Sequence, residues 1–278
     1  MRLKTFISII LTLSFFGLPK PDKEKKRPDE PTFVFIPMGS MNLDDKIYTL
    51  DAFWIFPTEV TNKEYNEFLE DLKSQGRVDD YDASAVRSEC WNTLKLSLYE
   101  PYSQFYHNHP AYENYPVVGI TKEGARLYCE WLSAKFDNKY TYRLPTRVEW
   151  IYAARGGLDV SDYPWGNKHI RDKKGKVLCN FKEIGDENIK YDDSLKTYCI
   201  VKGAKVGMPV LTAAYPPNEF GLYDVAGNVA EMVQEDGIAM GGSWDSPGYD
   251  VRVTSLMTWD DPDPRVGFRP VREYKGKE

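Results

Sequence analysis

The chain has 278 residues, enough to bury one large hydrophobic core or two smaller ones. Aromatic residues make up 14% of it, and Gly and Pro are plentiful, which is typical of a loop-rich globular domain and not of a helical bundle. The net charge is -6 and basic residues are scattered along the sequence, so we expect no nucleic acid partner.

The N-terminal residues predict export. A short basic region, MRLK, precedes an apolar run at residues 5–19, which has the length of a secretory signal and is too short to span a bilayer comfortably. No small-x-small cleavage site follows, and Leu18 stands where a lipoprotein signal would have cysteine. We therefore interpret residues 1–19 as a signal peptide or an uncleaved anchor. The charged, proline-rich segment that follows predicts a disordered linker, and the expected divisions are linker 20–31, folded domain 32–274 and tail 275–278.

Local patterns predict a mixed α and β body. Residues 32–40 and 48–56 alternate apolar and β-forming side chains and predict strands. A helix is predicted after Thr61, because Thr61 and Glu64 have the spacing of a capping box and Gly76 ends the apolar periodicity. Two further helices are expected.

The second predicted helix runs from about Thr121 to Ala134, and the third begins at Pro145 and ends at Gly156-Gly157. Beyond Leu158 the sequence predicts turns and short strands as far as the closing GFRPVRE. Connections of this length in a compact domain suggest structural ions, aromatic contacts or binding loops.

The four cysteines have no CxxC or Cys/His metal spacing. Cys129 lies on the apolar face of the second predicted helix, so we expect it in the core. Cys179 and Cys199 flank a charged insertion, and two alternatives stay open: a disulfide that closes the insertion in an oxidising compartment, or free thiols. His107 and His109 flank Asn108, and because an acidic third ligand is missing nearby, we interpret them as turn and packing residues.

Seven stretches identify the chain further: FWIFPTEVTNKEYNEFL, YPVVGITKEGARLYCEWLS, YRLPTRVEWIYAARGG, YPWGN, PPNEFGLYDVAGNVAEM, GGSWDSP and VGFRPV. In this order, over residues 33–271, they resemble the formylglycine-generating enzyme (sulfatase-modifying factor) family. The resemblance implies an α+β fold related to C-type lectins. Such a fold is rich in loops, with short helices around small antiparallel sheets.

The same resemblance implies that the chain is not an enzyme. Active members carry two cysteines after the GGSW motif; these bind copper, and one of them takes part in oxidising a substrate cysteine to formylglycine. The matching positions are Ser246 and Val251, which offer no soft sulfur ligand, so we expect no copper. The alternative of a residual enzyme that uses Ser246 would need a nearby general base, and the sequence offers only Asp245 and Asp250 there.

A structural calcium site is implied by the segment YDVAGNVAE. By resemblance its ligands are the side chains of Asp224 and Glu231 and the backbone carbonyls of Gly227 and Val229. Two carboxylates around a glycine-containing turn suit a hard cation, and the alternative is an ordinary turn in which Asp224 accepts hydrogen bonds from neighbouring N–H groups. A second calcium site of the family would begin at Asn180.

That second site, which would include the Phe181 carbonyl, is predicted to be lost because Lys202 stands in place of its acidic ligand, unless Asp192 and Asp193 compensate. We also interpret two groups of residues as structural. The first are core aromatics, Trp131, Trp150, Trp165, Tyr223 and Trp244; the second are buried or half-buried charge pairs, Arg143, Glu149, Arg155 and Arg269.

Within the family, FYHNHPAYENYPVVGI is most similar to the exported gliding-motility and type IX secretion subunits of Bacteroidota. This resemblance implies a non-catalytic scaffold or accessory subunit of an outer-membrane-associated protein complex, located in the periplasm, at the outer membrane or at the cell surface, close to a membrane. Residues 257–268 offer either a groove for a peptide or partner protein, or a solvated rim. The alternative function is a carbohydrate- or peptide-binding module on the same fold.

Overall fold

The computed structural model describes residues 31–94, 99–136, 139–184, 189–200, 207–260 and 262–275, with backbone alone at 189–191 and 198–200. The chain divides into two units, Met1–Glu30 and Pro31–Glu278, and every described residue belongs to the second. The predicted leader and Lys202 therefore lie outside the described residues. No helix among the described residues is long and apolar enough to cross a bilayer.

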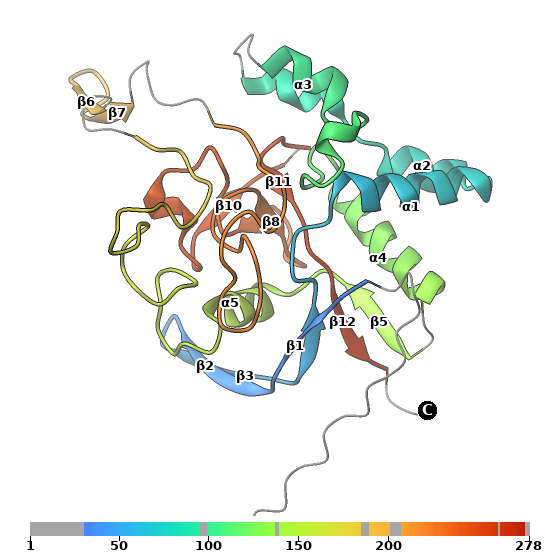
Figure 1. The fold of residues 1–278 in the computed structure, drawn as a ribbon, viewed down its shortest axis with the longest axis horizontal. Coiled ribbons are helices and arrows are strands. Elements are labelled where there is room, and N and C mark those ends of the chain that lie inside the picture. Colours follow the sequence, from blue (N-terminus) through green and yellow to red (C-terminus); the bar gives the residue numbers. More distant parts are fainter. Residues whose placement is uncertain are drawn as a thin grey trace, which may run out of the picture. The chain divides into compact units, whose positions relative to one another are not determined.

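One four-stranded antiparallel sheet joins the two ends of the domain. Its order is β1 (Val34–Ile36), β4 (Phe53–Ile55), β12 (Val271–Tyr274) and β5 (Tyr140–Arg143). Ile55 of β4 is paired with Val34 on one side and Val271 on the other. Strand β12, the last in the sequence, therefore lies between β4 and β5. Figure 1 shows β12 beside β5 with β1 close by.

The remaining strands are short. A second sheet has the order β10 (Leu256–Thr258), β9 (Ile238–Met240), β8 (Ala230–Met232) and β11 (Val266–Gly267), in which β11 and β8 are parallel. Two antiparallel ribbons complete the set, β2 (Gly39–Leu43) with β3 (Lys46–Leu50), and β6 (Ile189–Asp192) with β7 (Thr197–Ile200). The predicted α+β, loop-rich fold with short helices and small sheets is confirmed, apart from this one parallel pair.

The first two predicted helices begin where expected, and the third begins at Arg147, two residues after the predicted start at Pro145. Helix α1 (Asn62–Ser74) has the Thr61–Glu64 capping box, and α5 (Arg147–Arg155) has a second one formed by Thr146 and Glu149. Helix α4 (Lys122–Phe136) begins after Thr121, whose hydroxyl accepts a hydrogen bond from the Gly124 N–H. It extends two residues beyond the predicted end, because Phe136 is still buried in the core.

Several short elements were not predicted: α2 (Val78–Ser84), α3 (Glu100–Phe105) and the 3₁₀ turns Ser88–Leu94, Pro110–Tyr112 and Gly248–Val251. The predicted strands are also shorter than expected. Residues 32–40 divide at Pro37, which lacks a backbone N–H donor, and residues 48–56 divide at Asp51 and Ala52. Figure 1 shows α1, α2, α3 and α4 gathered on one side of the domain.

The core has two main parts. Helices α1 and α4 enclose an aromatic cluster in which Tyr65 and Tyr128 stack with ring centroids 5.8 Å apart. The Phe268 ring makes a T-shaped contact with each of these two rings. Helix α5 packs Trp150 against the first sheet and against Met240 of β9. Both parts meet the 230–240 region, which places the segments that follow β8 and β9 at the centre of the molecule.

Candidate functional site

The stretch 241–253 follows β9 and folds back on itself. Gly241 and Gly242 have φ angles of 83° and 66°, a region that other residues rarely adopt. A Cβ atom on Gly242 would lie 2.2 Å from the Asp250 carbonyl oxygen, so only glycine permits this return. The two positions that the resemblance assigned to copper-binding cysteines, Ser246 and Val251, lie on this closed turn.

Ser246 serves the turn itself. Its hydroxyl accepts a hydrogen bond from the Ser243 N–H at 3.0 Å, and the Ser243 hydroxyl accepts one from the Asp245 N–H at 3.2 Å. The Ser246 and Ser243 hydroxyl oxygens are 3.3 Å apart. No imidazole or free carboxylate among the described residues forms a hydrogen bond with Ser246, so its hydroxyl has no base to activate it.

Val251 is fully buried, with 0% of its surface exposed, in a small apolar cluster with Tyr163, Cys179 and Ala226. Burial raises the pKa of the Cys179 thiol, which keeps it protonated and a poor metal ligand. Cys179 is a free thiol, and the Cys199 side chain lies outside the described residues. The residues around this position do not fit a copper ion, and they support no copper-dependent step.

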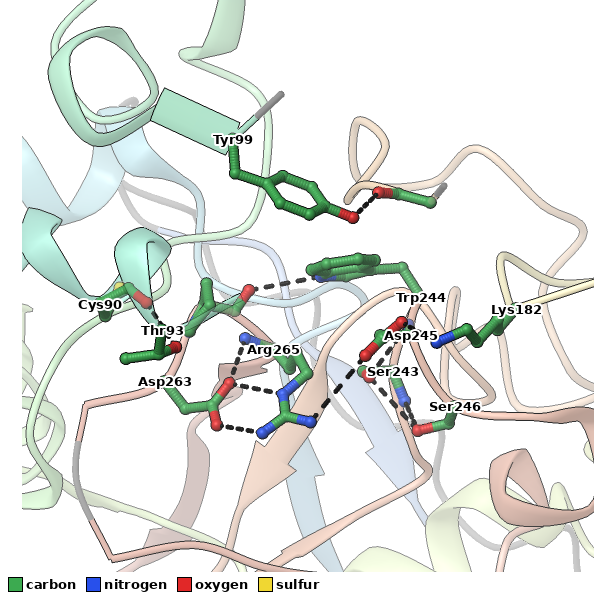
Figure 2. A network of polar contacts seen from close by, with 12 residues as sticks. Cys90, Thr93, Tyr99, Lys182, Ser243, Trp244, Asp245, Ser246, Asp263 and Arg265 are labelled. Carbon is green, nitrogen blue, oxygen red and sulfur yellow. Dashed lines mark hydrogen bonds and ion pairs between the residues drawn. The ribbon is translucent and has the colours of Figure 1, made fainter. Parts of the chain in front are cut away.

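Four charged side chains of alternating sign lie in a row beside the turn (Figure 2). Lys182 Nζ lies 2.7 Å from Asp245 Oδ1, and Asp245 Oδ2 lies 4.0 Å from Arg265. Arg265 forms a two-point contact with Asp263, at 2.9 and 2.6 Å. Each of these two carboxylates therefore faces a cation, an arrangement that stabilises the loops beside the turn.

Trp244 connects this turn to the helical side of the domain. Its ring is fully buried, stacks on Trp91 at 6.3 Å and lies 5.7 Å from Tyr99, whose hydroxyl donates to the Gly207 carbonyl (Figure 2). Trp131 and Trp150 are buried as predicted, whereas Trp165 and Tyr223 are half-buried. Arg143 pairs with Glu149, both among the predicted charges. Arg269 is paired as expected, but its partner is Glu231, which was predicted as a calcium ligand, and Arg155 donates to backbone carbonyls.

The histidines have structural roles, as predicted. His107 is buried and its Nδ1 lies 3.2 Å from the Asn62 side-chain oxygen, and burial lowers the pKa of His107 to about 3. His109 accepts a hydrogen bond from the Ala111 N–H at the start of a 3₁₀ turn. Across the described residues, His, Cys, Asp and Glu side chains form no group of three or more that could hold a metal.

The expected calcium ligands divide into two kinds. Asp224 is 6% exposed; its Oδ2 accepts from the Ala213 N–H at 2.6 Å, and its Oδ1 is buried without a partner. Glu231 has no free oxygen, because Arg269 donates to both of its oxygens at 2.6 and 2.7 Å and the Trp150 indole donates to one at 2.7 Å. Asp224 is therefore available to a cation, and Glu231 is held by Arg269.

A third buried carboxylate, Glu59, was missed from the sequence. It is 0% exposed; its Oε1 accepts from the Asn228 amide at 2.9 Å and its Oε2 has no partner. Burial, and then repulsion from Asp224, raise the pKa of Glu59 well above its ordinary value. Burial also raises the pKa of Asp224 to about 6, against the lowering effects of the Ala213 N–H and Arg269. The sequence feature that could have identified Glu59 is its position, because it is an acidic residue between the apolar run 53–56 and Val60.

Three buried carboxylates thus face one guanidinium, and two of them keep a partnerless oxygen. Buried unpaired charge is costly, so such a cluster must hold protons or a cation. The backbone beside it is fixed: Asn228 N–H donates to the Asn180 carbonyl at 2.8 Å, and a Cβ on Gly227 would lie 2.0 Å from that oxygen. The partnerless oxygens of Asp224 and Glu59 are of the kind that a hard cation prefers as ligands.

The second calcium site has fewer available atoms. The Asn180 amide donates to the Met208 carbonyl at 2.8 Å, and its carbonyl is used by Asn228. Asp192 accepts from the N–H groups of Ser194 and Leu195 in the β6–β7 turn, so it serves its own hairpin. Lys202 lies outside the described residues, and the predicted loss of this site remains a prediction.

A hollow of about 710 Å³ lies elsewhere, between α4 and β5. It shares no lining residue with the 241–253 turn. Its charged side chains are largely paired with one another: Arg126 with Glu123 and Glu130, and Lys122 with Asp236. It adds no reactive group to the turn.

Known proteins share the sequence pattern and the fold of this chain. A family model described as the sulfatase-modifying factor enzyme 1-like domain matches residues 18–274. The "Inactive C-alpha-formylglycine-generating enzyme 2" of Bos taurus is 29% identical over 248 residues, covering 77% of this chain and 74% of that protein. The "Formylglycine-generating enzyme" of Bos taurus is 28% identical over 247 residues, covering 75% and 59%. The solved structure of CarF shares the fold, with a TM-score of 0.59 and 20% identity over 88% of this chain and 99% of that one.

Proposed function

The chain belongs to the sulfatase-modifying factor enzyme 1-like family, and from this we propose that it is an exported, non-catalytic member that acts as an accessory or scaffold subunit. The observation that carries the proposal is the turn at 241–253. Ser246 is bound into the turn and Val251 is buried in an apolar cluster, where the resemblance places two copper-binding cysteines. Similarity to relatives named as inactive supports the same conclusion.

The proposed partner is a protein subunit of an outer-membrane-associated assembly, of the gliding-motility or protein-secretion type. The location we propose is the periplasm or the outer membrane. The support for this is the family resemblance of residues 105–120 and the apolar N-terminal run. Burial of Trp131, Trp150 and Trp244 leaves these three rings unavailable to stack on a sugar.

We further propose a structural calcium ion bound by Asp224 with the Gly227 and Val229 carbonyls. In this proposal Glu59 supplies the second carboxylate and Glu231 keeps Arg269 in place. A calcium ion supplies two positive charges to a cluster whose three carboxylates exceed its one guanidinium by two. Neutralised in this way, the cluster would hold the turn before β8 against the segment that precedes α1, without any catalytic step.

The non-catalytic part is tested with a cysteine-containing peptide and Cu(I) under air. We expect mass spectrometry to recover the peptide unoxidised to formylglycine, because no thiolate is available at 246 or 251. An active formylglycine-generating enzyme, treated in parallel, is the positive control. Conversion by the wild-type chain that disappears in Ser246→Ala would overturn the proposal and establish the residual enzyme.

A further inference from the structure

Among the described residues, one exposed loop concentrates positive charge on this acidic protein. The basic loop, residues 166–176, has the sequence GNKHIRDKKGK, in which five Lys or Arg against one Asp give a charge of +4. The whole chain carries -6, so the rest of it carries -10. All five basic side chains are exposed. Overall composition conceals this separation of charge.

The one acidic residue of the loop holds its turn. Asp172 Oδ1 accepts hydrogen bonds from the N–H groups of Lys174 and Lys176, both at 2.8 Å. The Asp172 N–H donates to the Lys176 carbonyl at 2.9 Å, and the Gly175 N–H donates to the Asp172 carbonyl at 2.9 Å. The negative charge therefore faces the backbone of the turn, and the lysine side chains are left to solvent.

Further contacts fix both ends of the basic loop. The Trp165 indole donates to the His169 carbonyl at 2.8 Å, and the Leu178 N–H donates to the Ile170 carbonyl at 3.1 Å. The backbones of Arg171 and Val177 form an isolated antiparallel β-bridge, and the Arg171 guanidinium forms an ion pair with Glu183 at 2.6 Å. A ligand would thus meet a preformed surface and need order little backbone. In Figure 1 the basic loop belongs to the yellow-green trace that follows α5.

The lysines of the basic loop lack acidic partners. No carboxylate in the described part of the chain pairs with Lys168, Lys173 or Lys174. Beside them lies an open hollow of about 430 Å³, lined by Asn167, His169, Ile170, Arg171, Asp172 and Lys173. The surface therefore combines uncompensated ammonium groups with aliphatic stems, a combination suited to a dense array of negative headgroups.

We propose that the basic loop is a docking surface for a membrane that contains anionic phospholipids. Flexible lysines act as point charges and match a diffuse anionic plane, whereas a bound phosphate would favour converging arginine forks. The net charge of -10 on the rest of the chain is repelled by the anionic membrane surface, so the molecule would approach the membrane with the basic loop facing it. A long nucleic acid would run from the loop onto acidic surface, which disfavours it.

This inference goes beyond the accessory function and does not depend on which protein is the partner. The test uses the full chain with vesicles of phosphatidylcholine alone and of phosphatidylcholine mixed with phosphatidylglycerol. The loop variant is K168Q/K173Q/K174Q. The matched control, K46Q/K63Q/K275Q, removes three exposed lysines elsewhere. Because all three proteins share the apolar run and the basic residues of the N-terminus, the contribution of that segment to binding cancels in the comparison.

We expect the wild type to bind the anionic vesicles more tightly than the neutral ones, and added salt to weaken that difference. The loop variant should lose on the order of fivefold in partition for each lysine, about a hundredfold in all. The control variant should bind as the wild type does. Equal binding of both variants, or equal wild-type binding to both vesicle types, would refute the proposal. So would salt-sensitive binding to duplex DNA or an acidic protein without vesicle binding.

Discussion

Replacing Asp224 with asparagine should stabilise the calcium-free protein at neutral pH. The Oδ1 atom of Asp224 is buried without a partner, and burial raises the pKa of this carboxyl. Asparagine removes the charge and keeps an oxygen that can accept from the Ala213 N–H. The substitution thus removes an unfavourable charge at nearly constant volume.

The magnitude follows from the raised pKa of Asp224, about 6 against an ordinary value of 3.8. The difference of about two units corresponds to about 3 kcal/mol of unfolding free energy. Because the folded-state pKa lies above the unfolded one, the native state holds the proton more tightly. The cost is absent below about pH 4, grows as the pH rises, and is complete above about pH 6. Asp224→Asn should therefore be up to about 3 kcal/mol more stable at pH 7.5 and equal to wild type near pH 4.

Calcium should cancel most of this difference. A ligand that binds only the native state at a hundred times its Kd adds about 2.7 kcal/mol, and the variant should lose that gain. The assay is urea unfolding followed by tryptophan fluorescence, with chelator or with calcium, across this pH range. Asp45→Asn, at an exposed turn position, is the matched control. A variant less stable than wild type in chelator at pH 7.5, or stabilised equally by calcium, would refute the reasoning.

Three other substitutions or titrations test the surrounding structure. Arg269→Met leaves the Glu231 carboxylate buried without its cation and should cost about 3–5 kcal/mol in urea unfolding; a cost below about 1 kcal/mol would contradict the pairing. His107, with its pKa lowered to about 3, should show no change in its ring NMR resonances between about pH 5 and 8, whereas titration near its ordinary value would mean that it is exposed. Thr146→Ala removes the α5 capping box and should lower the unfolding free energy by about 1 kcal/mol, with unchanged stability as the contrary result.

The sequence predicted those parts of the fold that local chemistry decides. Thr61 with Glu64 forms the predicted capping box, because this contact spans only three residues. The equally local box of Thr146 with Glu149 was not predicted. Gly156 ends α5 in the left-handed conformation for the same local reason. The short helices α2 and α3 were not predicted, because seven and six residues are too few to show a helical period of apolar residues.

The candidate site depended on contacts that no local pattern reveals. Asn228 joins Glu59 across 169 positions of sequence, and Arg269 meets Glu231 across 38. The segment YDVAGNVAE predicted Asp224 as a calcium ligand, and the structure shows that one of its oxygens is buried without a partner. It did not reveal that Arg269 holds Glu231, or that Glu59 completes the cluster. Periodicity describes single elements, whereas this cluster is assembled by tertiary packing.

The most direct test of the accessory function is recovery of the native complex. A C-terminally tagged full chain would be purified from mildly solubilised envelopes of its own host, and its companions identified by mass spectrometry. We expect stoichiometric recovery of outer-membrane or secretion-machinery subunits, absent from an untagged control. Recovery of the chain alone, under detergent that preserves known complexes, would contradict the accessory function and favour a carbohydrate- or peptide-binding module.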